Sequence, residues 1–268
     1  MALPLPTSLS PSKVSAFKDC ALAFRFAAIE RLPEPPTASA TKGTLVHMAL
    51  ERLLDQPPEA RTPETALQLL GEAHAELARH PDFTELELSE AEEAQFVLDA
   101  QTLVRRYFEL EDPRQVRAIG LELQLEARVG NLLLRGVIDR LELDEDGELV
   151  VTDYKTGRPP TELFEHGRLG GVHFYAFLCQ EFLGRRPSKV QLLYLSQPLS
   201  IVARPSEQSV RGLQQRTLAV WNAVERACER EDFRPRPSRL CEWCSFRQFC
   251  PAWGGDPADA RQLVAAGA

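Results

Sequence analysis

The chain has 268 residues, of which 44% are apolar and 26% are charged, and its formal net charge is −8 at pH 7. This length allows one large domain or two small ones with a full core, and the composition is typical of a soluble globular protein. No apolar run is long enough to span a membrane and no secretory leader is visible, which predicts a cytoplasmic protein, while the negative charge argues against a general nucleic-acid coat.

The first predicted helix starts at Ser10, which can cap it, with Pro11 in its first turn. Its apolar residues recur at helical spacing: Val14, Phe17, Ala21, Phe24 and Ala28. Cys20 lies next to this apolar face near the middle of the helix. By itself it is typical of a small core residue.

A second helix is predicted after Gly43, in the sequence TLVHMALERLL. His47 and Glu51 are one turn apart on one face of it. A single histidine on a helix is more often structural than a ligand, so His47 alone indicates no site. The segment from Pro63 to Asp112 predicts two amphipathic helices, a helical insertion of about residues 60–112 that covers a sheet.

From Ala118 the apolar period changes to two, because Leu121, Leu123 and Leu125 alternate with polar residues, Glu122 among them. This pattern predicts a half-buried strand. The sequences RGVIDRLEL and LVVTDYKTG follow after short turns, one of them at residues 144–147. The three strands are therefore predicted to form an antiparallel meander.

The remaining elements predict an α/β fold. They are a helix at 169–183, strands at 190–196 and 199–203, and a long helix at 206–231. A helical crossover between Lys155 and Val190 would make two strands parallel. We therefore expect a mixed β-sheet flanked by helices.

Charged residues end the apolar strand Leu149 to Gly157. Asp153 and Lys155 are two residues apart, so on a strand they share a face. If the preceding strand pairs with this one, Asp139 and Asp153 can converge on one divalent cation beside Lys155. That combination can hydrolyse phosphodiesters. The alternative is a surface ion pair, which is common and weak.

Three of the six cysteines lie close together near the C-terminus, at Cys241, Cys244 and Cys250, in the spacing C-x2-C-x5-C. In a reducing compartment this clustering predicts a metal centre rather than disulfides. A tetrahedral zinc site or a four-iron cluster needs a fourth ligand, for which the candidates are Cys20, Cys179 and Cys228. Cys179 and Cys228 lie on predicted apolar helix faces, so each can also be a core residue.

A series of motifs, taken in chain order, resembles the RecB-family exonucleases. The series is Cys20, GTLVH, RGVIDR, TDYKTG, HFYA and C-x2-C-x5-C. These belong to the PD-(D/E)XK nucleases, and the similarity is to the iron–sulfur branch with the CRISPR-adaptation exonucleases and the AddB nuclease domain. The resemblance implies a single PD-(D/E)XK nuclease domain over residues 1–268. It also implies a metal-dependent DNA exonuclease, acting on single-stranded ends in DNA repair or recombination, whose partners are DNA and a helicase or other repair protein.

The resemblance also implies roles for individual residues. His47, Asp139 and Asp153, with the Tyr154 carbonyl, would bind Mg²⁺ or Mn²⁺, and Lys155 would position the attacking water. Catalytic Tyr175 would lie in the family's helix motif, in which Gly171 replaces the usual Gln. The four residues Cys20, Cys241, Cys244 and Cys250 would hold a [4Fe-4S] cluster that joins the first helix to the tail at about residues 234–253.

Arginines near the cysteine cluster form a candidate DNA contact, namely Arg234, Arg236, Arg239 and Arg247. The alternative is that they are solvated. Two other function classes stay open at this point. One is a non-catalytic DNA-binding subunit of a helicase–nuclease complex, and the other is a protein with a purely structural zinc site.

Overall fold

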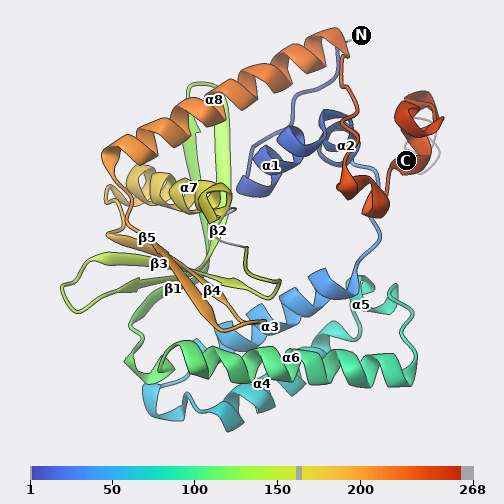
Figure 1. Ribbon diagram of the computed structural model, residues 1–268. Coiled ribbons are helices and arrows are strands. Elements are labelled where there is room, and N and C mark those ends of the chain that lie inside the picture. Colours follow the sequence, from blue (N-terminus) through green and yellow to red (C-terminus); the bar gives the residue numbers. More distant parts are fainter. Residues whose placement is uncertain (1, 161–164, 261–268) are drawn as a thin grey trace. The chain divides into compact units, whose positions relative to one another are not determined.

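The computed structural model describes residues 2–160 and 165–260 and contains a five-stranded sheet (Figure 1). The strands lie side by side in chain order and are β1 (Ala118–Val129), β2 (Leu132–Leu143), β3 (Leu149–Lys155), β4 (Lys189–Tyr194) and β5 (Leu199–Ala203). β2 and β3 are antiparallel, with Arg140 opposite Thr152. β3 and β4 are parallel, with Lys155 opposite Tyr194, and β4 and β5 are antiparallel. The mixed sheet that the sequence predicted is confirmed.

The parallel pair requires a crossover, which the helix α7 (Glu165–Leu183) supplies. Three apolar residues of this helix are buried, namely Phe174, Phe177 and Leu178. The hairpin between β2 and β3 closes through Gly147, whose φ of 73° is a left-handed conformation that favours glycine. Its N–H donates to the Asp144 carbonyl at 3.0 Å, so the predicted turn is confirmed.

The α-helices of the described residues are α1 (Pro11–Asp19), α2 (Ala21–Phe24), α3 (Ala38–Asp55), α4 (Pro63–Leu77), α5 (Pro81–Thr84), α6 (Glu90–Leu110), α7 and α8 (Glu207–Arg230). Short 3-10 segments are η2 (Pro58–Ala60), η3 (Pro113–Gln115), η5 (Arg239–Trp243), η6 (Arg247–Phe249) and η7 (Pro251–Trp253), and η1 (Arg25–Glu30) is a π-helix. α4 and α6 confirm the two amphipathic helices of the insertion, with the short α5 between them.

The main apolar core lies between α3, α4, α6 and the sheet. Leu50, Leu70 and Val104 are buried there together with Tyr154 of β3 and Leu193 of β4. Figure 1 shows α3, α4 and α6 on one side of the sheet and α7 on the other. Burial of large apolar side chains is the dominant favourable contribution to folding, so this core fixes α3 against the end of β3.

Two predicted helix boundaries are wrong. α3 begins at Ala38 rather than after Gly43, because the Thr37 side chain caps it by accepting a hydrogen bond from the Ala40 N–H. The first helix does not continue through Cys20. α1 ends at Asp19, the Cys20 backbone is extended with φ −159°, and a new helix starts at Ala21.

The chain divides into two compact units. The first, which we call the cysteine unit, comprises Met1–Pro35, Glu126–Gly136 and Arg211–Ala268. The second, the sheet unit, comprises Pro36–Leu125 and Val137–Val210. The single domain over the whole chain therefore stays a prediction. Within the described ranges, no helix combines the length and the apolar character that crossing a membrane would require.

Candidate active site

The end of β3 positions two charged side chains. β3 is buried from Leu149 to Tyr154, and Asp153 is only 3% exposed. Because residues two apart on a strand share a face, Asp153 and Lys155 lie together, and they form an ion pair. The Asp153 carboxylate is buried, whereas the lysine side chain is 40% exposed, so Lys155 can reach a ligand outside the sheet.

The second carboxylate belongs to β2. Asp139 is 8% exposed, and its Oδ2 accepts a hydrogen bond of 2.7 Å from the main-chain N–H of Tyr154. The predicted pairing of the two strands therefore brings Asp139 to the residue between Asp153 and Lys155. After burial, the negative charge of Asp153 also raises the pKa of the Asp139 carboxyl.

His47 reaches the same place from α3. Its Nε2 lies 3.2 Å from the Tyr154 carbonyl oxygen, and its Nδ1 lies 3.5 Å from Glu122 Oε1 and 3.7 Å from Asp139 Oδ2. A carbonyl oxygen only accepts, so Nε2 carries the proton in this contact and Nδ1 faces the carboxylates. Gly43 allows the close approach of the helix, because a Cβ there would lie 3.3 Å from the Thr156 hydroxyl oxygen.

Glu122 is a site residue that the sequence reasoning missed. Strict alternation on β1 placed it on the solvent face. In the structure its backbone is left-handed, with φ 43°, and its carboxylate faces His47. One ligand atom each from His47, Glu122 and Asp139 lie within 4.8 Å of one another, and no other His, Cys, Asp or Glu trio in the described residues does so. Periodicity gave no signal for this, since a left-handed residue inside a strand is rare.

The electrostatics of the site indicate a deficit of positive charge. Burial, and then the charge of Asp153, raise the pKa of Asp139 to about 7. Burial alone would lower the pKa of His47, but a hydrogen bond with Glu122 and the charges of Asp139 and Asp153 raise it overall. A cation would relieve both effects. The donor set of imidazole and carboxylate oxygens therefore fits a divalent metal ion.

Tyr175 of α7 also joins the site. Its hydroxyl donates a hydrogen bond of 3.0 Å to Asp153 Oδ1, and burial followed by the charge of Asp153 raises its pKa. Gly171 lies one turn earlier on the same helix, and no atom lies within 4 Å of the position that a Cβ would take. A Cβ at residue 171 would therefore meet no neighbouring atom.

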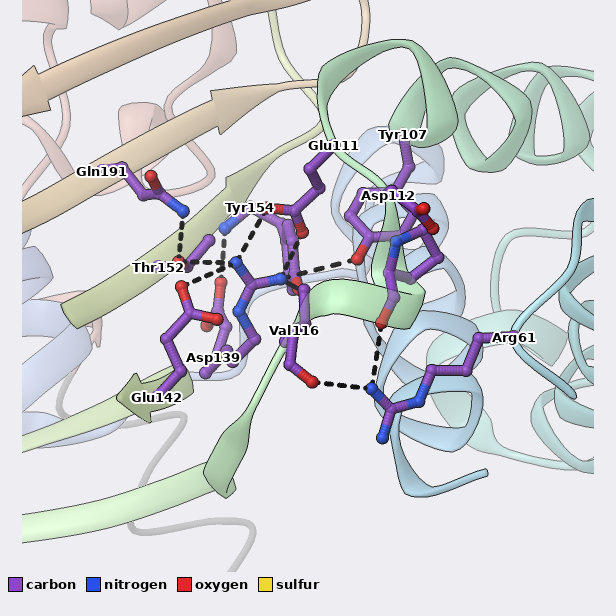
Figure 2. A network of polar contacts seen from close by, with 12 residues as sticks. Arg61, Tyr107, Glu111, Asp112, Val116, Asp139, Glu142, Thr152, Tyr154 and Gln191 are labelled. Atoms are coloured by element: carbon purple, nitrogen blue, oxygen red, sulfur yellow. Dashed lines mark hydrogen bonds and ion pairs between the residues drawn. The ribbon is translucent and has the colours of Figure 1, made fainter. Parts of the chain in front are cut away.

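A network of polar contacts around a buried arginine lies next to Asp139, and Figure 2 labels its members Glu111, Thr152 and Tyr154. Arg140 follows Asp139 on β2 and is fully buried. Its guanidinium donates to the Tyr154 hydroxyl at 2.9 Å, to Thr152 Oγ1 at 3.0 Å and to Glu111 Oε2 at 2.9 Å. The network thus restrains the Tyr154 ring, while the backbone of the same residue contacts Asp139 and His47.

A cavity of about 690 Å³ opens at this site. His47, Glu122, Tyr154 and Lys155 line it, whereas the two aspartates Asp139 and Asp153 are not among its lining residues. All of these residues belong to the sheet unit. A phosphate group entering the cavity would meet the first four together.

The cysteine unit contains a second candidate site. Cys20, Cys241, Cys244 and Cys250 line one cavity of about 500 Å³. The extended backbone at residue 20 brings its Sγ to 3.5 Å from the Arg236 N–H, which donates to it. The two other cysteines, Cys179 and Cys228, do not line this cavity. Burial raises their pKa values to about 12 and about 11, as expected for thiols in a core.

The four arginines of the candidate DNA contact are all exposed. Arg234 forms an ion pair with Asp232 at 3.0 Å, and Arg236 donates to the Lys18 carbonyl at 2.8 Å. The Arg247 guanidinium lies 3.9 Å from the centre of the Trp253 ring. The fourth, Arg239, begins η5.

Comparison with known proteins identifies relatives of the whole fold. The family model for the PD-(D/E)XK nuclease superfamily matches residues 8–251. Among solved structures, the crystal structure of the "Putative exonuclease" from Eubacterium rectale gives a TM-score of 0.55 at 10% identity, covering 89% of this chain and 87% of that one. At this identity the likeness shows the fold alone. The crystal structure of SSO0001 gives a TM-score of 0.38 at 14% identity, with 87% and 92% covered, and carries no argument. No curated protein matches the sequence.

Proposed function

Since the chain belongs to the PD-(D/E)XK nuclease superfamily, we propose that it is a Mg²⁺- or Mn²⁺-dependent DNA exonuclease of the RecB type. Its substrate would be single-stranded DNA ends, and its role would be in DNA repair or recombination, beside a helicase or another repair protein. One observation carries the proposal. The ligand atoms of His47, Glu122 and Asp139 lie within 4.8 Å of one another, and Lys155 faces the same cavity.

The residues that would hold the cation are His47, Asp139 and Asp153, with the Tyr154 carbonyl oxygen. Glu122 adds a carboxylate that the family resemblance did not include. When bound, a divalent ion withdraws electron density from a phosphoryl oxygen and offsets the negative charge that develops there. The raised pKa values of His47 and Asp139 support this assignment, because burial and Asp153 raise that of Asp139, and the neighbouring carboxylates raise that of His47.

The chain's own groups can carry the remaining work. The reaction adds a water oxygen to phosphorus and breaks one phosphorus–oxygen ester bond, which leaves a phosphate monoester and a hydroxyl. Lys155 would orient the water and donate hydrogen bonds to the negatively charged oxygens of the transition state. The ion pair with Asp153 restrains the lysine, and the Tyr175 hydroxyl restrains Asp153 in turn. Both restraints reduce the reorganisation needed during the reaction.

For the cysteine unit we propose a [4Fe-4S] cluster on Cys20, Cys241, Cys244 and Cys250. These cysteines line one cavity, and burial followed by the charges of Cys20, Cys241 and Cys250 raises the pKa of Cys244, which supports one shared centre. Both a tetrahedral zinc ion and a four-iron cluster are held by four thiolates. Iron content and brown colour of anaerobically purified protein would separate the two.

A non-catalytic DNA-binding subunit of a helicase–nuclease complex is the second candidate function. Gly171 favours it, since the catalytic families resembled here have a glutamine at that point of the helix. The ion pair of Lys155 and the convergent ligands disfavour it, because a site that has lost its function has no need to keep them.

The test is an assay on end-labelled single-stranded, double-stranded and circular single-stranded DNA, with Mg²⁺, Mn²⁺ or EDTA. We expect labelled mononucleotides or short products from linear single strands with either metal, none with EDTA, and intact circles. Cleaved circles would indicate an endonuclease. Folded protein that releases nothing with either metal would contradict the nuclease and favour the non-catalytic subunit.

A further inference from the structure

The cysteine unit exposes large apolar side chains beside its cysteines. Trp243 is 76% exposed, Leu240 56% and Trp253 49%, and all three line the cavity that contains the cysteine sulfurs. The third tryptophan of the chain, Trp221, is 4% exposed. We call the surface formed by Leu240, Trp243, Arg247 and Trp253 the tryptophan face. An exposed apolar group of this kind usually marks a binding surface.

The tryptophan face is not needed to pack the cysteine site. Phe246 and Phe249 come from the same segment but are buried, at 4% and 8% exposure. Their rings lie 5.5 and 6.0 Å from that of Phe26, so the phenylalanines join this segment to the N-terminal helices. The tryptophans point to solvent instead, and their exposure calls for another explanation.

Charge narrows the choice of partner. The cysteine unit has 15 Lys and Arg against 11 Asp and Glu, whereas the sheet unit has 16 against 28, so their net charges of +4 and −12 sum to the −8 of the chain. Lys13, Arg236 and Arg247 line the cavity, against Asp19 and Glu34. A unit that is positive as a whole, in an acidic protein, favours an anionic partner.

Arg247 stacks on Trp253 with its guanidinium 3.9 Å from the ring centre, which fixes a planar cation over an aromatic plane. Flat aromatic groups interleaved with arginine bind unpaired bases, because every base has a π-face and every nucleotide has a phosphate. In a duplex these faces are covered by neighbouring bases. The partner that matches both features is therefore a single strand.

We propose that the tryptophan face binds single-stranded nucleic acid, with bases stacked on Trp243 and Trp253 and with phosphates contacted by Arg247. This inference rests on the proposed function and gives it a substrate-binding surface outside the metal site. The surface lies wholly in the cysteine unit.

Binding can be measured apart from cleavage, by fluorescence anisotropy of a labelled oligothymidylate with Lys155→Ala protein in EDTA. An oligomer of about 15 nucleotides suits such a site, and each lost stack should weaken binding between about 5-fold and about 150-fold. We expect this loss in Trp243→Ala and in Trp253→Ala. Trp243→Phe and Trp253→Phe should recover most of it, because phenylalanine also stacks.

Trp221→Phe is the matched control and should bind like the parent. Iron content reports whether the cysteine unit is intact in each variant. Alanine variants that keep both the iron content and the DNA affinity of the parent would overturn the proposal. The same result is expected if the tryptophan face binds a protein instead of DNA. If an alanine variant loses iron, the phenylalanine variants and Arg247→Met decide in its place.

Two further measurements separate bases from phosphates. On an abasic oligomer of the same length, the tryptophan variants should bind no more weakly than the parent. Arg247→Met should lower the slope of log affinity against log salt by about 0.7, the value for one single-strand phosphate contact, whereas Trp243→Ala should leave the slope unchanged. The proposal would be overturned if Trp243→Ala lost the same affinity on abasic, single-stranded and duplex DNA. It would also be overturned if Arg247→Met left the salt dependence of the affinity unchanged.

The outcomes for this surface and for the proposed function are distinguishable. Tryptophan-dependent binding by a protein that cleaves no DNA would leave the inference standing and remove the nuclease. Cleavage by a protein whose tryptophan variants bind normally would do the reverse.

Discussion

The main-chain N–H of Tyr154 donates a 2.7 Å hydrogen bond to Asp139 Oδ2, which ties the carboxylate of one strand to the backbone of the next. The carbonyl of the same tyrosine lies 3.2 Å from His47 Nε2. One residue of β3 thereby contacts two of the proposed metal ligands through its backbone. Arg140 donates to the Tyr154 hydroxyl at 2.9 Å, so the fold restrains this residue through its ring as well as through its backbone.

Lys155→Ala should lower the rate of DNA cleavage by about a hundredfold or more while leaving the fold intact, since it removes a stabiliser of transition-state charge. Single-turnover cleavage of end-labelled DNA measures this. Lys42→Ala is the control, because Lys42 also pairs with an aspartate, Asp99, but lies outside the cavity. Equal rates in the two variants would remove Lys155 from the mechanism.

Arg140→Ala should destabilise the protein by about 3–5 kcal/mol, because it leaves buried Glu142 and Thr152 without their cationic partner. Urea unfolding measures the loss. Arg52→Ala removes the exposed pair with Glu76 and should cost less than about 1 kcal/mol. If the two variants unfold at the same urea concentration, the network of Figure 2 contributes no more than a surface pair.

Local pattern was enough to predict most of the fold. The apolar run of β3, the turn at Gly147 and the apolar face of α7 are all visible in the sequence, and each has its counterpart in the structure. The break at Cys20 was not predictable, because the helical period continues through it. That break depends on local backbone geometry and on the distant Arg236 N–H, which contacts the sulfur.

The candidate site was predictable where strand pairing sets it. Asp139 meets the backbone between Asp153 and Lys155 because two neighbouring strands place them there. Glu122 was missed because a left-handed residue reverses the alternation that otherwise assigns it to solvent. Arg140 was missed because its network depends on contacts with the end of α6, at Glu111, and with the neighbouring strand β3, which local periodicity does not report.

The affinity for Mn²⁺ should rise with pH through about 7, the pKa of Asp139, and level off only once His47, whose pKa is also raised, has lost its proton. At a pH below its own pKa, Asp139 or His47 must lose a proton before the ion binds. Each of these protons lowers the affinity about tenfold per pH unit. Calorimetry in buffers of different ionisation enthalpy measures both affinity and proton release.

Metal-free protein should show the opposite trend in stability. An unfolded aspartate ionises near pH 3.9, so between about 4 and 7 only the folded state holds the Asp139 proton. This contribution to the free energy of unfolding is therefore present at low pH and is lost as the pH rises through about 7. A constant affinity for Mn²⁺ between about pH 5 and 8 would contradict the first trend, and a metal-free stability that does not fall between about pH 4 and 7 would contradict the second.

Cys20→Ala should lose bound iron and brown colour and melt earlier. A cluster that joins residues 20 and 241 closes a loop of roughly 220 residues, which by the loop-entropy model for disulfides restricts the unfolded chain by about 5 kcal/mol. Cys179→Ala and Cys228→Ala remove buried thiols outside the cavity and should keep full iron. Iron and sulfide analysis of anaerobic protein decides. Full iron in Cys20→Ala would place the cluster on other cysteines.

Isothermal titration with Mn²⁺ tests the proposed metal site most directly. The parent should bind the ion, and Asp139→Asn, Asp153→Asn and Glu122→Gln should each bind it at least about tenfold more weakly, because each loses a charged oxygen ligand. Glu126→Gln, which removes a carboxylate from the same strand as Glu122 but one paired with Arg135, should bind like the parent. Unchanged affinity in both aspartate variants would show that the two carboxylates share no ion, and would contradict the account.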